Sequence, residues 1–170
     1  MSLISNATTR QASPTDAARI ADAHRDSIES IGSAFYPPIV VAAWQDGLAP
    51  DLYIRAMERG EVFFIAEHLD GNGHEVLGFA SDYAIESGRY GVSAYVRGRA
   101  TRQGVGSALL RLAEADAIHK GAKIISIEAS LAAVEFYSAN GYVETGRGDT
   151  HLASGQPIEC VFMKKDLQKT

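Results

Sequence analysis

The expected fold is built around Thr101-Arg102-Gln103-Gly104-Val105-Gly106-Ser107-Ala108-Leu109-Leu110, a basic turn with two glycines that runs into an amphipathic helix. Glycine brings the backbone close to a ligand without a Cβ in the way, and the N–H groups of the first helical turn have no partner inside the helix. The helix dipole and Arg102 add positive charge at the same place. This stretch therefore predicts an anion-binding helix start, with a phosphate as its guest.

Before this turn, the sequence predicts a short polar strand or extended arm within residues 1 to about 12, followed by three helices and three strands. The first helix begins at Ser13 and Pro14, an N-cap followed by a residue suited to the first helical position, and ends near Gly32. Two short helices follow over 39–46 and 50–59. From residue 61 the hydrophobic pattern changes to the two-residue period of strands. Residues 62–66, 75–85 and 90–96 are therefore expected to form an antiparallel meander, with a turn at Asp70-Gly71-Asn72-Gly73 between the first two strands.

After the turn, helical and strand patterns alternate. The helix runs from Val105 to Lys120, and a strand over 123–129 follows, so the crossover is right-handed and the strands on either side of it are parallel. A helix over 131–139, a short strand over 142–145 and a last strand over 157–164 come next. These elements predict a mixed α/β (α+β) fold in a single domain that covers residues 1–170.

Composition excludes several classes of protein. The chain has 170 residues, a net charge of -5 and a single cysteine, Cys160, so no intramolecular disulfide can form and a cytoplasmic location is expected. Its apolar runs are shorter than the roughly 20 residues that span a bilayer, and no basic block suggests nucleic-acid binding. The histidines and the cysteine lack metal-ligand spacing. We therefore expect no metal, no membrane and no nucleic acid among its ligands and partners.

Two familiar phosphate-binding signatures do not fit the turn. A dinucleotide fingerprint requires a third glycine where Leu109 stands and follows a parallel strand rather than a meander, although Glu128 has the spacing of its ribose acid. A nucleoside-triphosphate loop requires Gly-Lys followed by Ser or Thr, which is absent after Gly104 and Gly106. The turn therefore binds its anion as part of neither a dinucleotide-binding site nor a nucleoside-triphosphate loop.

Four segments, which make up two motifs, together resemble a known family. They are Tyr95-Val96, the turn from Arg102 to Leu110, Glu128-Ala129-Ser130, and Ala133-Val134-Glu135-Phe136-Tyr137-Ser138-Ala139-Asn140-Gly141-Tyr142. Their order and spacing resemble the GNAT superfamily of acetyl-coenzyme A (acetyl-CoA)-dependent N-acetyltransferases. The resemblance implies a mostly antiparallel mixed sheet of about six or seven strands, splayed into a V between the fourth and fifth, with about four or five flanking helices.

The resemblance also implies acetyl-CoA (coenzyme A) as co-substrate. Its pantetheine arm would lie between the splayed strands, and its pyrophosphate would meet the N–H groups at the helix start. The residues implied to contact the cofactor are Tyr95, Val96, Arg102, Gln103, Gly104, Val105, Gly106, Ser107, Ser130, Ala133 and Phe136. Thr101 stands where the family usually has Gln or Arg, so the basic contact is left to Arg102 or Arg99. Ser130 stands where many members have an Asn that contacts the cofactor.

Acyl transfer to an amine requires a proton acceptor, donors for the oxyanion and a proton for the departing thiolate. The resemblance implies that Tyr137 supplies that last proton; packing on its helix is the alternative role. Glu128, at the end of a central strand, and His151, expected in a loop, are the candidate bases. Asp82 and Glu86 are further candidates that the sequence does not rank.

The acceptor is the part that the sequence defines least. Tyr36 and Trp44 are candidates for a wall of its pocket, with burial as the other interpretation, whereas His24 and Cys160 are expected in the core. The partner is expected to be a small-molecule or peptide amine, and a homodimer could form through the last strands. The expected function is N-acetyl transfer by direct attack in a ternary complex; a non-catalytic acyl-CoA sensor and a nucleotide-binding module are the alternatives.

Overall fold

The computed structural model describes residues 6–70 and 73–168, so part of the expected turn at Gly71-Asn72 lies outside the described residues. The strands are β1 (Ala7–Gln11), β2 (Val62–Asp70), β3 (Gly73–Glu86), β4 (Arg89–Val96), β5 (Ile124–Ser130), β6 (Val143–His151) and β7 (Pro157–Asp166). The α-helices are α1 (Ala17–Ser30), α2 (Pro38–Asp46), α3 (Pro50–Glu58), α4 (Val105–His119) and α5 (Val134–Ala139). Short 3-10 turns within the described ranges include η2 (Pro14–Asp16), η3 (Gly32–Ala34), η4 (Gly98–Ala100) and η5 (Leu131–Ala133).

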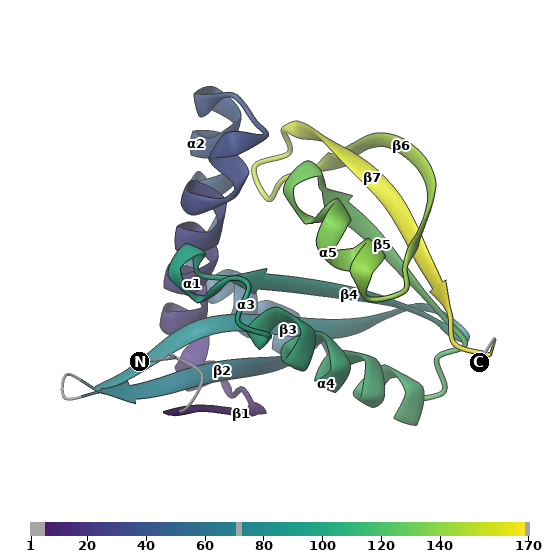
Figure 1. Ribbon diagram of the computed structural model, residues 1–170, viewed down its shortest axis with the longest axis horizontal. Helices are drawn as coiled ribbons and strands as arrows, with labels where there is room; N and C mark the ends of the chain where they lie inside the picture. The colour runs from purple at the N-terminus through teal and green to yellow at the C-terminus, as the bar shows by residue number, and fades with distance from the viewer. Residues whose placement is uncertain (1–5, 71–72, 169–170) are drawn as a thin grey trace.

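The described strands form one seven-stranded sheet in the order β1-β2-β3-β4-β5-β7-β6. Neighbouring strands are antiparallel except β4 and β5, which are parallel because the chain crosses over through α4 between them. β4 and β5 pair only as far as Gly91 and Ser126 and then diverge, so the sheet opens into a V (Figure 1). The mixed sheet and its splay between the fourth and fifth strands confirm the fold expected from the sequence.

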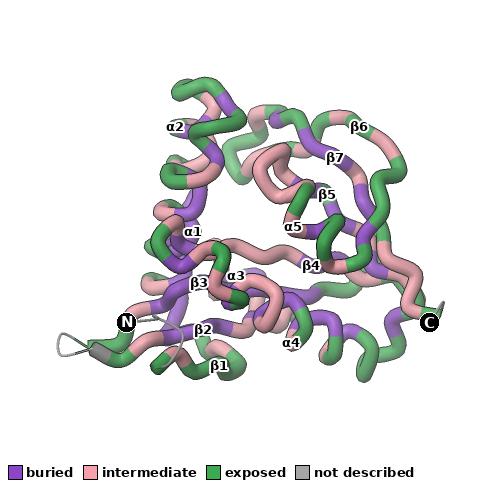
Figure 2. The backbone as a smooth tube through the Cα atoms, viewed as in Figure 1, coloured by how far each residue is buried: buried purple, intermediate pink, exposed green. Residues whose placement is uncertain are grey.

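Helices cover both faces of the sheet. α4 and α5 pack on one face around residues such as Leu109, while α1 and α3 cover the other face of β2 and β3 around Ile20 and Phe79. A third buried cluster, which includes Tyr36 and Ile158, joins α1 and α2 to β7. β3 carries a continuous buried stretch over residues 76–82, which is visible in Figure 2. The α1–α2 end therefore connects the two arms of the V across its open side.

Several boundaries differ from those expected. The first helix begins with η2, where the Ser13 N–H donates to the Asp16 carboxylate at 2.9 Å, and the helix expected over 131–139 divides into η5 and α5. The strand expected to end at Thr145 continues as β6 to His151, paired with β7 throughout. β6 is a mostly polar edge strand, which lacks the hydrophobic alternation that reveals a strand in sequence. His151 therefore ends a strand and does not lie in a loop.

Candidate active site

The turn between β4 and α4 is shaped by two left-handed residues. Gly104, which immediately precedes α4, has a φ of 81°, and Arg102 has a φ of 57°, which is uncommon for a residue with a side chain. The Thr101 hydroxyl and the Gln103 side-chain amide donate to carbonyls of η4 at 2.8 Å and 2.9 Å. These bonds hold the turn without using the N–H groups at the start of α4, which remain directed out of the helix end.

Gly106 lets α5 lie against the first turn of α4. A Cβ placed on Gly106 would be 3.0 Å from the Phe136 ring and 3.3 Å from both that ring and the Val96 side chain. Phe136 in turn packs on Tyr137 with ring centroids 5.1 Å apart. The absence of a side chain at Gly106 therefore sets how closely the two helices that flank this end of β4 can approach.

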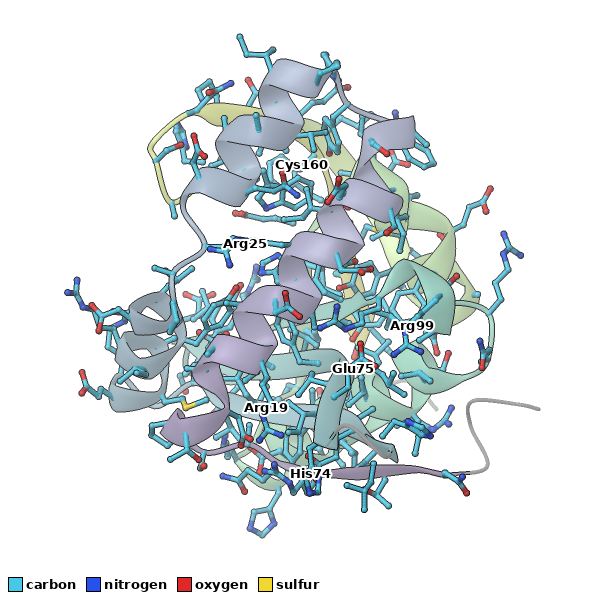
Figure 3. The ribbon with its side chains drawn as sticks, turned by 90° about the vertical axis from the view of Figure 1, so that its left-hand side faces the viewer. Arg19, Arg25, His74, Glu75, Arg99 and Cys160 are labelled. Carbon is cyan, nitrogen blue, oxygen red and sulfur yellow. The ribbon has the colours of Figure 1, made fainter. Side chains whose placement is uncertain are left out.

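The structure separates the two basic residues near the turn. Arg99 is paired with Glu75, and both side chains are labelled in Figure 3. Arg102 is exposed and forms no ion pair with any described residue, and it lines the cavity described below. Because its charge is not neutralised by a protein carboxylate, Arg102 is the cation available to an anion at the start of α4.

A cavity of about 480 Å³ lies between this turn, the end of β4, α5 and the end of α1. Its lining includes all but two of the residues expected to contact a cofactor, namely Tyr95, Val96, Arg102, Gly104, Gly106, Ser107, Ser130, Ala133 and Phe136. The exceptions are Gln103, whose side chain folds back on η4, and Val105, which is buried in the core. The structure therefore gathers residues from both sequence motifs around one cavity.

Tyr137 projects from α5 to the open side of β4. Its side chain is buried, and its hydroxyl oxygen accepts a hydrogen bond from the Ala94 N–H at 3.1 Å. Ala94 lies beyond the last residue of β4 that pairs with β5, so this N–H faces the opening of the V. The hydroxyl proton of Tyr137 has no acceptor among the described residues. Burial raises the pKa of Tyr137 above its ordinary value, so the proton is retained at neutral pH.

The two candidate bases lie apart from each other. Glu128 is exposed on β5, on the same face as Ser130, and its carboxylate accepts a hydrogen bond from the Thr150 hydroxyl. His151 is exposed at the end of the edge strand β6, opposite Pro157, and does not line the cavity. Only Glu128 therefore stands on a strand that borders the opening of the V.

The two candidate substrate residues also differ in position. Trp44 lines the cavity and packs edge-on against Tyr95 with ring centroids 6.2 Å apart. Tyr36 is buried, and its hydroxyl is used within the protein: it donates to the Glu159 carbonyl at 2.7 Å and accepts from the Leu131 N–H at 2.8 Å. Tyr36 thus ties the start of α2 to the β5 arm of the V.

The other titratable residues considered from the sequence are engaged elsewhere. Asp82 is fully buried and accepts from the Lys120 ammonium at 2.9 Å, and burial raises its pKa to about 6. Glu86 is exposed and pairs with Arg89. Cys160 is buried, and burial raises the pKa of its thiol. His24 is a core residue as expected, but only its Nδ1 has a partner, the Tyr53 hydroxyl at 2.9 Å, and its Nε2 has none among the described residues.

Part of the cavity wall was not foreseen from the sequence. Ser27, Ile28, Ile31 and Gly32, at the end of α1 and the start of η3, line the cavity. Ser27 interrupts the apolar stripe of α1, and a small polar residue on such a stripe is the signal that could have found it. Among the described residues, no group of three or more His, Cys, Asp or Glu side chains could hold a metal ion, and no helix is long and apolar enough to cross a membrane.

Comparisons with known proteins agree with this geometry. The profile of the family described as an acetyltransferase (GNAT) domain matches residues 27–167. A GCN5-related N-acetyltransferase from Rhodopseudomonas palustris is 28% identical, with a TM-score of 0.79 over 95% of this chain and 96% of that one. The PaiA N-acetyltransferase of Thermoplasma acidophilum, solved in complex with coenzyme A, is 18% identical, with a TM-score of 0.73 over 95% and 99% of the two chains.

A GNAT-superfamily phosphinothricin acetyltransferase from Sinorhizobium meliloti, solved with acetyl-CoA, is 21% identical, with a TM-score of 0.65 over 95% of this chain and 89% of that one. A comparison with curated protein sequences gives no match. The two structures below 25% identity establish likeness of fold only, whereas the family profile spans most of the sequence, including both motifs and the splayed strands. The chain therefore belongs to the GNAT family of acetyltransferases.

Proposed function

We propose that this protein transfers an acetyl group from acetyl-CoA to a primary amine by direct attack in a ternary complex. The observation that carries this proposal is the opening between β4 and β5 beside the start of α4. It offers backbone hydrogen-bonding groups of β4 to an extended ligand and, at its end, an anion site. A phosphorylated ligand with an extended arm fits both features at once.

The residues present fit coenzyme A. The pyrophosphate would lie at the N–H groups that begin α4, next to the uncompensated charge of Arg102. The pantetheine arm would run along Ala94, Tyr95 and Val96 in the cavity, with Ser130 and Ala133 on the opposite wall. Bound acetyl-CoA would supply an activated acyl group with a thiolate as its leaving group.

Tyr137 and Ala94 would then lie near the reacting thioester. The Ala94 N–H, which donates to the Tyr137 hydroxyl, faces the opening and would turn to the oxyanion that develops on the acyl carbonyl. The Tyr137 hydroxyl, which keeps its proton because burial raises its pKa, is the donor available to the departing thiolate. Trp44 forms a wall of the cavity, where it would face an acceptor. Glu128, exposed on β5 next to the opening of the V, would offer a negative charge to the ammonium group of that acceptor.

The proposal is tested by measuring release of free coenzyme A from acetyl-CoA. The amines are a primary alkylamine, an α-amino acid, an aminoglycoside, a polyamine and a peptide with a free N-terminus. We expect amine-dependent release and an N-acetylated product by mass spectrometry. Binding of acetyl-CoA without release for any amine would instead support the acyl-CoA sensor. Thermal stabilisation by adenine dinucleotides but not by coenzyme A would support the nucleotide-binding module.

The anion site makes a separate prediction. Replacing Arg102 by alanine is expected to raise the Kd for coenzyme A about 10-fold, equivalent to about 1.4 kcal/mol, because one charge-assisted contact to phosphate is lost. The loss should shrink at high ionic strength, since salt screens exposed charges. Isothermal titration calorimetry at two salt concentrations measures both effects.

Arg99→Ala is the matched control for this change, because Arg99 lies in the same segment but is paired with Glu75. We expect its Kd for coenzyme A to stay within about twofold of the wild-type value. The opposite result, a loss with Arg99→Ala and none with Arg102→Ala, would move the phosphate contact to Arg99.

A further inference from the structure

A chain of hydrogen bonds crosses three strands on the face of the sheet opposite α4. The Ser81 hydroxyl on β3 donates to Glu61 Oε1, just before β2, at 2.6 Å, and the Ser81 and Ser93 hydroxyl oxygens are 2.8 Å apart. Ser81 pairs with Ser93 of β4 in the strand register, so the two side chains share one face. Neither motif that carries the family resemblance includes these three residues.

The direction of the chain follows from counting protons. A serine hydroxyl has a single proton to donate, and that of Ser81 goes to the Glu61 carboxylate. The bond between the two serines must therefore run from the Ser93 hydroxyl to the Ser81 oxygen. Both hydroxyl protons, that of Ser93 and that of Ser81, are then donated in the direction of Glu61. The Ser93 oxygen, at the other end, keeps a lone pair that can accept a further proton.

The free end of this chain lies at the opening of the V. Ser93 is two residues beyond Gly91, the last residue of β4 that pairs with β5, and directly precedes Ala94 in the cavity wall. Successive side chains of a strand point to opposite faces, so Ser93 lies on one side of β4 and the Ala94 side chain on the other. Tyr137 packs with the cluster on the Ala94 side. The Tyr137 hydroxyl, a proton donor, and the Ser93 hydroxyl oxygen, a proton acceptor, therefore lie on opposite sides of β4.

The surroundings of Glu61 favour proton exchange. Glu61 is only partly exposed, and burial raises its pKa above the ordinary value, partly offset by the Ser81 hydrogen bond and the charge of Arg59. Tyr83 lies on the same face, over Gly91, where an added Cβ would be 2.2 Å from its ring. Burial raises the pKa of Tyr83, as do the charges of Glu61 and Glu128. The face thus carries two carboxylates and a tyrosine that remains neutral.

We infer that Glu61, acting through the hydroxyls of Ser81 and Ser93, receives the proton that the acceptor amine loses when it attacks the thioester. This inference rests on the proposed function. The amine nitrogen forms the N–C bond and gives its proton to the Ser93 oxygen, Ser93 gives its own to Ser81, and Ser81 gives its own to Glu61. The C–S bond breaks, and Tyr137 protonates the thiolate. Glu61 then releases its proton to solvent, and Tyr137 regains a proton from solvent before the next turnover.

Cross-strand serine bonds also occur for purely structural reasons, so the test must follow the proton. With the panel amine that gives the highest rate, we expect Glu61→Gln to lower kcat about 100-fold at neutral pH, with the KM for acetyl-CoA unchanged. The deficit should shrink as pH rises, because hydroxide from solvent can then accept the proton that the attacking amine loses. Ser93→Ala, which interrupts the relay but keeps Glu61, should give the same pH profile. In the wild-type protein, the acid limb of the kcat/KM profile should follow the raised pKa of Glu61, so activity falls as pH drops through it.

Matched controls are Glu86→Gln and Ser87→Ala, which remove the same groups from the exposed β3–β4 turn and should leave the profile unchanged. Thermal unfolding of each variant checks that it is folded, and Glu61→Asp should restore part of the activity if only the carboxylate matters. A normal profile for Glu61→Gln, or a normal profile for Ser93→Ala beside an impaired Glu61→Gln, would overturn the relay. Loss of the acid limb in Glu128→Gln alone would assign the proton to Glu128. A wild-type protein that acetylates no amine would refute the proposed function itself, which distinguishes that failure from failure of the relay.

Discussion

Replacing Tyr137 by phenylalanine is expected to lower kcat by about 100- to 1,000-fold while the KM for acetyl-CoA changes little. The change deletes only the hydroxyl, which accepts from the Ala94 N–H at 3.1 Å and carries a proton that no described residue accepts. Because the side chain is buried against Phe136 and Tyr142, the phenyl ring keeps the packing. Steady-state kinetics with the best amine of the panel separate kcat from KM.

The pH dependence gives a second measurement. Burial raises the pKa of Tyr137 above that of an exposed tyrosine, so the wild-type protein should keep its proton donor, and its kcat, up to about pH 10. In Tyr137→Phe the thiolate must leave without that proton, so the deficit should persist across the range. A variant that keeps wild-type turnover at every pH would reduce Tyr137 to a packing residue.

Tyr142→Phe is the matched control. Tyr142 is equally buried, but its hydroxyl donates to Glu114 at 2.9 Å, on the α4 side of the sheet and away from the cavity lining. Removing that hydroxyl costs one buried hydrogen bond, about 1 to 2 kcal/mol of folding free energy, and should not change kcat. Together the two variants separate chemistry from stability.

Replacing Gly106 by valine is expected to raise the Kd for coenzyme A by about 100-fold, or about 2.7 kcal/mol. A Cβ at this position would already be 3.0 Å from the Phe136 ring, so the branched side chain must push α5 aside and occupy part of the cavity. It would also crowd the N–H groups that begin α4. Calorimetric titration with coenzyme A measures the loss, and an unchanged Kd would mean that the ligand does not lie at the start of α4.

The control for this change must also introduce valine into α4, so that it has a similar cost in helix propensity. Ala115→Val places valine on the exposed face of α4, at a position that does not line the cavity. Valine costs about 0.5 kcal/mol of helix propensity there, without blocking the site. We expect normal coenzyme A binding and a small loss of thermal stability from this variant.

The glycine turn and its helix could be predicted from sequence because they depend on local forces. Gly104 adopts the left-handed backbone conformation that its lack of a Cβ allows. α4 begins at the next residue, so the positive end of its dipole lies at this turn. The order of strands and helices followed from the period of the hydrophobic pattern and from the handedness of the crossover. The family motifs identified Phe136 as a candidate cofactor contact and Tyr137 as a candidate proton donor. Each of these signals is contained within a few neighbouring residues.

The sequence did not reveal which residues become neighbours through strand pairing. The Glu61, Ser81 and Ser93 side chains meet only because the register of β2, β3 and β4 places them on one face, and a shift by one residue would separate them. Likewise, only the tertiary structure pairs Arg99 with Glu75 and uses the Tyr36 hydroxyl between η5 and β7.

The sequence alone therefore determined the glycine turn, the start of α4, the crossover and the motif residues, because backbone geometry and helix electrostatics act over a few residues. The tertiary structure decided which basic residue is left uncompensated, where β4 and β5 part, and which hydroxyls connect Glu61 to that opening. Those outcomes depend on contacts between segments far apart in the chain, and such contacts are set by register and packing rather than by local sequence.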